Sequence, residues 1–227
     1  MFEDLIKEYA IREPQGTDTW NPLRNELELW HRVKLFITFK SVLEQLDLPI
    51  SEIRALDVGC GVGRSTRALL EFGLSPENLV GIDLRASAIS RASYVNPAID
   101  FRVVEGLNDW PAIGSFDLCM QCTVFGSIRG LESRLALAEM MEKAVRNNGY
   151  IFWWDSILAN RFAGGDLIDP RSLFRNCKVV NYWLLSLRPS LGDAVNLKGR
   201  AGWLIQIFQR LFGFPETHCA AVFQKHG

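Results

Sequence analysis

The sequence predicts an α/β fold in which a mainly parallel sheet is covered by helices on both faces. Short apolar segments with strand-like patterning alternate with helix-like segments from residue 53 to residue 155. Strands joined through helices form right-handed crossovers and therefore pair in parallel. The chain has 227 residues, of which 48% are hydrophobic and 22% charged, so we expect one folding unit with a full core.

The first part of the chain predicts a helix that precedes the first strand. Apolar residues recur near helical spacing between residues 23 and 46, and Pro49 ends the pattern. We therefore expect an N-terminal helical cap over residues 1–50 and a main domain over residues 51–227.

The main domain continues with strands and helices in alternation. The helix after the fourth strand is expected to stop at Asn148 and Gly149. After Asp155 the alternation of strand-like and helix-like segments becomes less regular. The last two strands are open to antiparallel pairing. The expected strands cover residues 53–58, 78–84, 100–104, 115–121, 150–155, 178–187 and 217–224, and the expected helices after the first strand run to residue 70 and over residues 85–95, 131–147 and 203–212.

Composition excludes several classes of protein. The net charge of −1 argues against a strongly basic nucleic-acid binder. No apolar run reaches the ~18 residues that a membrane span needs, and the first residues do not resemble a signal peptide. Five scattered cysteines favour a reducing compartment, so we expect a cytoplasmic protein.

Two of these cysteines, Cys119 and Cys122, form a C-x-x-C pattern. Both lie on a predicted strand, where residues three apart face opposite sides of the sheet. No second pair of cysteines or histidines follows at zinc spacing, so we expect no metal site.

The most informative motif is the glycine-rich segment ALDVGCGVGRSTRALL at residues 55–70. It follows the first strand of the predicted sheet and enters a helix, which is the context of a nucleotide-binding loop. Gly59, Gly61 and Gly63 allow the backbone to approach a ligand closely and place amide groups at a helix N-terminus. The motif therefore predicts a ligand site at this turn.

Two acidic residues indicate the kind of nucleotide. Asp57 precedes the first glycine by two residues, where a carboxylate suits a cationic ammonium group but not a pyrophosphate. Asp83 ends the second strand, where a carboxylate can accept hydrogen bonds from a ribose diol. A dinucleotide fingerprint would need a glycine in place of Arg64. The expected ligand is therefore an adenosyl amino acid, and an NAD-dependent enzyme is a weaker alternative.

Successive segments of the chain resemble the motifs of class I S-adenosylmethionine-dependent methyltransferases. The resemblance implies a Rossmann-like, seven-stranded sheet in the order 3-2-1-4-5-7-6, with strand seven antiparallel, and S-adenosylmethionine as the methyl donor. The segments that carry it are DVGCGVGRS, VGIDL, FRVVEG, SFDLCMQCTVFGSI and the helix followed by NNG and YIFWWD, within residues 53–155.

The resemblance also assigns residues to the donor. Many relatives have an aspartate directly after the glycine of strand three, whereas this chain has Leu107 and then Asn108, which becomes the better candidate for the adenine contact. Glycines 59, 61 and 63 form the loop. The other implied contacts are Asp57 and Cys60 for the methionine moiety, Asp83 for the ribose, Leu84 for the adenine face, and Gln121, Cys122 and Thr123 beneath the sulfonium.

The C-terminal third differs in charge from the rest of the chain. Residues 1–155 hold 16 basic and 22 acidic residues, whereas residues 156–227 hold 9 basic and 4 acidic ones. Residues 156–216 are expected on the side of the methyl acceptor. An anionic small-molecule or glycan acceptor is one interpretation of the basic residues, and a solvated surface is the other. The tail resembles a bacterial subgroup encoded among surface-glycan or secondary-metabolite genes.

The apolar segment 203–214 has three alternative interpretations: it packs beside the acceptor, contacts a membrane surface or forms the contact across a homodimer.

Methyl transfer to a hydroxyl group, the favoured reaction, benefits from a general base. His31 in the N-terminal helix and Asp155 at the end of the fifth strand are the two candidates. The alternative interpretation of His31 is a half-exposed helix residue, and that of Asp155 is a carboxylate that caps the loop after it. The alternative function of the whole chain is a non-catalytic partner subunit that binds the donor.

Overall fold

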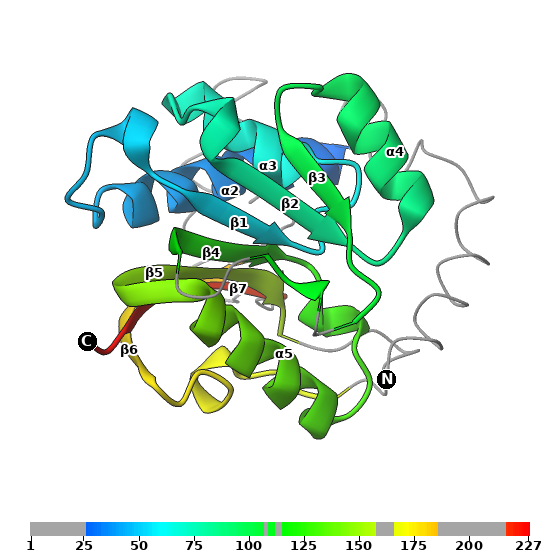
Figure 1. Cartoon of the computed structure of the whole chain (residues 1–227). Coiled ribbons are helices and arrows are strands. Elements are labelled where there is room, and N and C mark those ends of the chain that lie inside the picture. The colour runs from blue at the N-terminus through cyan, green and yellow to red at the C-terminus, as the bar shows by residue number, and fades with distance from the viewer. Residues whose placement is uncertain (1–25, 107–108, 112–114, 158–165, 186–216) are drawn as a thin grey trace, which may run out of the picture.

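Seven strands form one mixed sheet in the order β3-β2-β1-β4-β5-β7-β6 (Figure 1). The computed structural model describes residues 26–106, 109–111, 115–157, 166–185 and 217–227. The strands β1 to β5 pair in parallel, and β7 pairs antiparallel with both β5 and β6. The predicted sheet order and the antiparallel last pair are thus confirmed. The bounds are β1 Ala55–Val58, β2 Leu79–Asp83, β3 Asp100–Val103, β4 Phe116–Cys122, β5 Val145–Ser156, β6 Cys177–Leu185 and β7 His218–Lys225.

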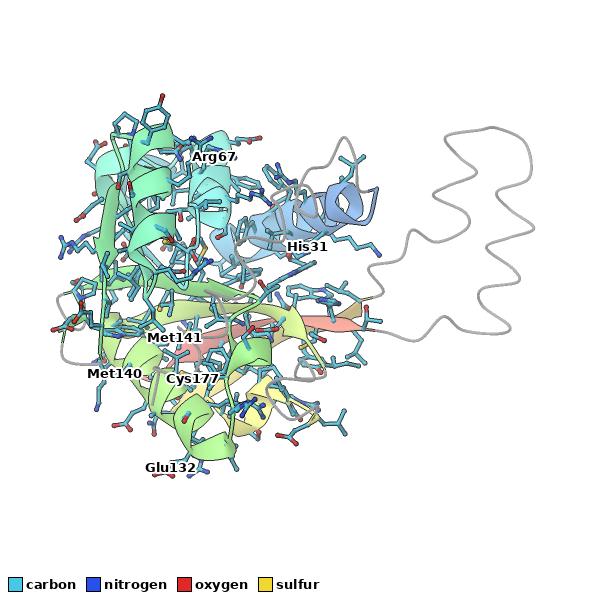
Figure 2. The ribbon with its side chains drawn as sticks, turned by 90° about the vertical axis from the view of Figure 1, so that its right-hand side faces the viewer. His31, Arg67, Glu132, Met140, Met141 and Cys177 are labelled. Carbon is cyan, nitrogen blue, oxygen red and sulfur yellow. The ribbon has the colours of Figure 1, made fainter. Side chains whose placement is uncertain are left out.

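Helices pack on both faces of the sheet. Helices α2 and α3 share one apolar core with alternate residues of the strands, and α5 shares a second core with the residues between them. Figure 1 shows α5 on one side of the sheet and α2 and α3 on the other. In Figure 2, Met141 on α5 is drawn among the buried side chains, whereas Glu132 in its first turn points outward. The bounds are α2 Glu26–Leu43, α3 Arg64–Ala68, α4 Ala86–Val95 and α5 Leu131–Ala144.

The N-terminal cap is described from residue 26 onward. Helix α2 buries Phe39 against Phe152 of β5, with ring centroids 4.9 Å apart. A helix here was predicted, and a division of the chain after residue 50 stays a prediction. The predicted helix 203–212 and most of the acceptor-side region lie outside the described residues.

One boundary was predicted wrongly. The helix expected over residues 131–147 ends at Ala144, and β5 begins at Val145. Asn148 has a φ of 60°, which asparagine tolerates, so the Asn-Gly pair bends a strand instead of ending a helix. The pairing of β4 with β5 shifts register here, and a Cβ on Gly149 would lie 3.0 Å from the carbonyl oxygen of Asp117.

Parallel pairing gathers the ends of several strands at one edge of the sheet. The carboxyl ends of β1, β2, β4 and β5 meet there, and because β7 is antiparallel, its first residue, His218, lies beside Ser156 at the same edge. Ligands of open α/β sheets bind outside these carboxyl ends. Within the part of the chain that is described, no helix has the length and apolar character to cross a membrane.

Candidate functional site

The glycine loop connects β1 to α3 at the carboxyl edge. Gly59, Gly61 and Gly63 all have left-handed φ angles, of 68°, 56° and 75°. A Cβ on Gly59 would lie 2.4 Å from Val124, whereas among the described residues a Cβ on Gly61 would meet only the end of the Arg85 side chain, at 3.4 Å. The first glycine therefore allows close packing against the loop after β4, and the middle one has no closer neighbour within the described residues.

Asp57 lies beneath this loop and is buried. Its Oδ2 accepts hydrogen bonds from the hydroxyl groups of Ser65, at 2.6 Å, and Thr66, at 2.7 Å. Its Oδ1 is buried without a hydrogen-bond partner among the described residues. Burial raises the pKa of this carboxyl to about 6, against the opposing effect of the two hydroxyl groups. A donor from a bound ligand, or a water between them, would satisfy the remaining oxygen.

Asp83 joins the end of β2 to the glycine loop. Its Oδ2 accepts from the backbone amide of Gly61 at 2.9 Å, and its Oδ1 accepts from the backbone amide of Arg85 at 2.9 Å and from Nε of the same residue at 3.2 Å. An ionised carboxylate offers about four acceptor positions, so these three donors leave room for a further hydrogen bond. Leu84 follows and is half-buried, whereas Leu107 and Asn108 lie outside the described residues.

The residues at the end of β4 and just after it pack against the glycine loop. The Gln121 side chain is buried; its Oε1 accepts from the amide of Val124 at 3.0 Å, and its Nε2 has no partner within the described structure. Thr123 has a φ of 65°, a strained conformation for a β-branched residue, and its amide donates to the carbonyl of Trp154 at 2.7 Å. Burial raises the pKa of the Cys122 thiol well above its usual value, so this thiol stays protonated. Burial raises the pKa of Cys60 in the same way.

The two candidate bases lie on opposite faces of the sheet. Trp153 packs on the α5 side, where its ring centroid is 4.4 Å from that of Phe125, and Trp154 packs on the α2 side. Asp155 follows on the α5 side, buried under the loop after β4, and accepts from the amides of Gly126 at 3.2 Å and Ser156 at 2.8 Å. Burial raises its pKa to about 7, opposed by these amides.

His31 lies on the other face. Its ring centroid is 5.2 Å from the indole of Trp154 and 6.3 Å from the ring of His218 (Figure 2). Burial, together with the neighbouring His218 and Arg32, lowers the pKa of His31 to about 4. The imidazole is therefore uncharged at neutral pH and able to accept a proton.

A comparison with family models matches residues 56–153 to a methyltransferase domain. Residues 56–153 carry this domain. The match covers the glycine loop, Asp83, the end of β4 and β5 as far as Trp153, and S-adenosylmethionine is the methyl donor of the enzyme. The sequence has no significant match among curated proteins.

Solved structures share the fold of this methyltransferase at low sequence identity. The N-methyltransferase NodS from Bradyrhizobium japonicum, in complex with S-adenosylhomocysteine, has a TM-score of 0.67 at 16% identity over 96% of this chain and 97% of its own. A TehB-like methyltransferase from Corynebacterium glutamicum has a TM-score of 0.60 at 19% identity over 96% and 97%. An S-adenosylmethionine-dependent methyltransferase from Mesorhizobium loti has a TM-score of 0.58 at 13% identity over 82% and 97%.

The residues of the methyltransferase fit the donor that its family uses. Three features lie around the ends of β1 and β4: Gly61, with room beside it, a buried carboxylate oxygen on Asp57 and a buried amide nitrogen on Gln121, neither atom having a partner in the described part of the chain. Among the described residues, no group of three or more histidine, cysteine or acidic side chains is arranged to hold a metal ion.

Sequence reasoning missed two residues that the structure brings to this site. Arg85 binds the ribose candidate Asp83, and the only signal was its place two residues after a strand-ending aspartate. His218 contacts His31 although 187 positions separate them, and no local pattern indicates such a contact.

Proposed function

We propose that this methyltransferase transfers a methyl group to a hydroxyl oxygen of a small molecule or a glycan. The observation that carries the proposal is the surroundings of His31, an uncharged imidazole at the carboxyl edge beside β5 and β7. S-adenosylmethionine supplies a methyl group that is already activated on a sulfonium. The chain then has to align the acceptor, exclude water and remove one proton.

His31 is the group that we assign to the proton. As the hydroxyl oxygen forms its bond to the methyl carbon, the carbon–sulfur bond breaks, sulfur leaves as a neutral thioether, and the hydroxyl proton passes to the imidazole. The pKa of about 4 keeps His31 uncharged over a wide pH range and lets it lose the proton to water afterwards.

Asp155 has a different role in this proposal. Its carboxylate accepts hydrogen bonds from the backbone amides of Gly126, in the loop after β4, and of Ser156, and its side chain is buried. It would therefore hold the loop after β4 in place, and through that loop the strained Thr123. We treat Asp155 as a positioning residue and His31 as the base.

The donor contacts follow from the same geometry. Asp57 would face the cationic part of the donor, directly or through water, with Gly59, Cys60, Gly61 and Gly63 as its loop. The ribose would bind Asp83, and the remaining proposed contacts are Leu84, Leu107, Asn108, Gln121, Cys122 and Thr123.

The acceptor class is proposed from charge. The C-terminal third has an excess of basic residues, which favours an anionic acceptor such as a nucleotide sugar or a diphosphate-linked glycan, in keeping with the resemblance to the bacterial glycan or secondary-metabolite subgroup. We further propose a cytoplasmic location, because all five cysteines are free, and a homodimer as the oligomeric state to test.

Mass spectrometry tests the proposed reaction. The protein is incubated with host extract and donor that carries an isotope-labelled methyl group, and Gly61→Val serves as the control without donor binding. We expect a product that gains one labelled methyl on oxygen. A label on nitrogen or carbon would contradict O-methylation, and no product above the Gly61→Val control would contradict catalysis and favour a donor-binding subunit.

A further inference from the structure

The first turn of α5 buries a charged side chain and exposes an apolar one. Arg134 is 4% exposed, whereas Leu131 is 58% exposed and Glu132 points outward in Figure 2. A cation in this turn also lies at the positive end of the helix dipole, which is unfavourable. Burial of a guanidinium group costs free energy unless its partners compensate for the lost water. The position of Arg134 therefore has to be explained by what its guanidinium group contacts.

The guanidinium group of Arg134 contacts two segments of the chain. Its Nε donates a hydrogen bond to the carbonyl oxygen of Ile128 at 3.0 Å. Its Nη1 lies 3.6 Å from Oδ2 of Asp166, whose side chain is 59% exposed. An ion pair with an exposed carboxylate contributes little. The hydrogen bond to Ile128, which is buried, is therefore the stronger of the two contacts.

The carbonyl of Ile128 lies at the end of a short turn that follows β4, the 3-10 turn Phe125–Ser127. The amide of Gly126, inside this turn, donates to Asp155 of β5 at 3.2 Å. Burial raises the pKa of that carboxyl, and the positive charge of Arg134 opposes the rise. Buried backbone groups need hydrogen-bond partners, and here two side chains from different elements supply them. The turn is thus held at its carbonyl from α5 and at its amide from β5.

The same turn is connected to the glycine loop through Val124. The amide of Ser127 donates to the carbonyl of Val124 at 3.0 Å, and the amide of Val124 donates to Oε1 of Gln121 at 3.0 Å. A Cβ on Gly59 would lie 2.4 Å from the Val124 side chain, so these two residues are already in close contact. A movement of the turn would therefore move Val124 relative to both the glycine loop and the end of β4.

We propose that Arg134 is a positioning residue of the methyl transfer, which fixes the turn after β4 through the carbonyl of Ile128 and so keeps Val124 against the glycine loop of the donor site. The inference rests on the donor contacts of the proposed function and deepens them. In this assignment Arg134 acts on the donor only through the turn. Arginine suits the role because its planar group holds the N–H donors in fixed directions, whereas a lysine ammonium is flexible.

Calorimetric titration of the full chain with S-adenosylhomocysteine tests this role. Arg134→Met removes both the donor and the charge, and we expect Kd to rise by roughly tenfold or more, as for loss of a hydrogen bond to a charged group. Arg134→Lys keeps the charge and an N–H donor and should recover part of the affinity. Two controls should bind as the wild type does. Asp166→Asn removes the exposed partner of the same guanidinium group, and Arg146→Met removes a guanidinium group that pairs with Asp117 near the amino end of β5.

Amide nuclear magnetic resonance of the same samples separates positioning from a general loss of stability. We expect the signals of Val124 and Gly126 to shift in Arg134→Met and to return toward their wild-type positions in Arg134→Lys. The amide of Asn176 donates to Glu142 in the last turn of α5 at 3.1 Å, so its signal reports on the packing of the far end of this helix and should stay unchanged.

The two measurements together decide the assignment. A wild-type Kd in folded Arg134→Met, or in Arg134→Lys where the methionine variant does not fold, would overturn the role of Arg134. An equal loss in Asp166→Asn or Arg146→Met, or a weakened Kd with unshifted Val124 and Gly126 signals, would overturn it too. Failure of the wild type itself to bind S-adenosylhomocysteine is a distinct result, because it would overturn the proposed donor site and the role of Arg134 with it.

Discussion

Replacement of Asp83 by alanine tests the donor site most directly. Asp83 contacts both the glycine loop, through the amide of Gly61, and the chain after β2, through Arg85. The variant removes the acceptor position that is left for a ribose hydroxyl group and also frees the loop amide. A hydrogen bond to a charged group contributes about 1.5–3 kcal/mol, so we expect donor binding to weaken by roughly 10- to 150-fold in Kd.

The assay is calorimetric titration with S-adenosylhomocysteine and with S-adenosylmethionine. Asp100 is a matched control, because on β3 it pairs with an arginine two residues later, as Asp83 does with Arg85, but it is exposed. Asp100→Ala should therefore bind both ligands as the wild type does. An additional variant, Asp83→Asn, keeps one acceptor oxygen and should lose less affinity than Asp83→Ala.

The comparison among these variants decides the assignment. Unchanged Kd values in Asp83→Ala would refute the ribose contact. An equal loss in Asp83→Ala and Asp100→Ala would indicate a general effect on the β2 and β3 side of the sheet. A loss confined to the Asp83 variants, with the circular dichroism spectrum unchanged, is the expected result.

Three further perturbations test the loop, the base and the packing of α5. Gly61→Val should abolish S-adenosylhomocysteine binding in calorimetry, whereas Gly73→Val, at another left-handed glycine, should bind normally; binding by Gly61→Val would contradict the loop assignment. If His31 takes the proton, turnover should be level at neutral pH and fall only as the pH decreases through about 4; a limb near 7 would point to Asp155 instead. Since the folded-state pKa of His31 lies below its ordinary value of 6.5, its contribution to stability is present above pH 6.5 and is lost as the pH falls toward 4, and His31→Gln should flatten that part of the Tm profile. Glu142→Gln should lower the free energy of unfolding by roughly 1–3 kcal/mol, because this buried carboxylate accepts hydrogen bonds from the backbone amide and the side chain of Asn176, just before β6; an unchanged urea midpoint would contradict this.

Much of the fold follows from local patterns in the sequence. The strand segments, the glycine loop and the helices between them are short-range features, and the resemblance to the methyltransferases supplied the strand order. The end of α5 was missed because Asn148 and Gly149 usually end helices, whereas here the left-handed φ of Asn148 bends β5 within its pairing with β4.

The site was predictable only in part, for a related reason. Asp57, Asp83 and the glycines sit within one or two residues of a strand end, so their place could be predicted. The contact of His218 with His31 depends on the reversal of β7 and on its register with β5, and neither is encoded near either histidine. Likewise, the sequence offered His31 and Asp155 as competing bases with no indication that the sheet separates them.

The two candidate bases, His31 and Asp155, lie on opposite faces of the sheet because neighbouring residues of β5 point to opposite faces. Trp154 and Asp155 are neighbours on β5, so the pleat sends the indole toward His31 and the carboxylate toward the loop after β4. The pairing of Trp154 with Ala220 and of Asp155 with Cys219 fixes this register. A shift by one residue would exchange the two sides and disrupt both at once. One strand therefore supports both candidates: Trp154 packs against His31 of α2, and Asp155 lies under the loop after β4, so loss of either His31 or Asp155 should leave the other in place.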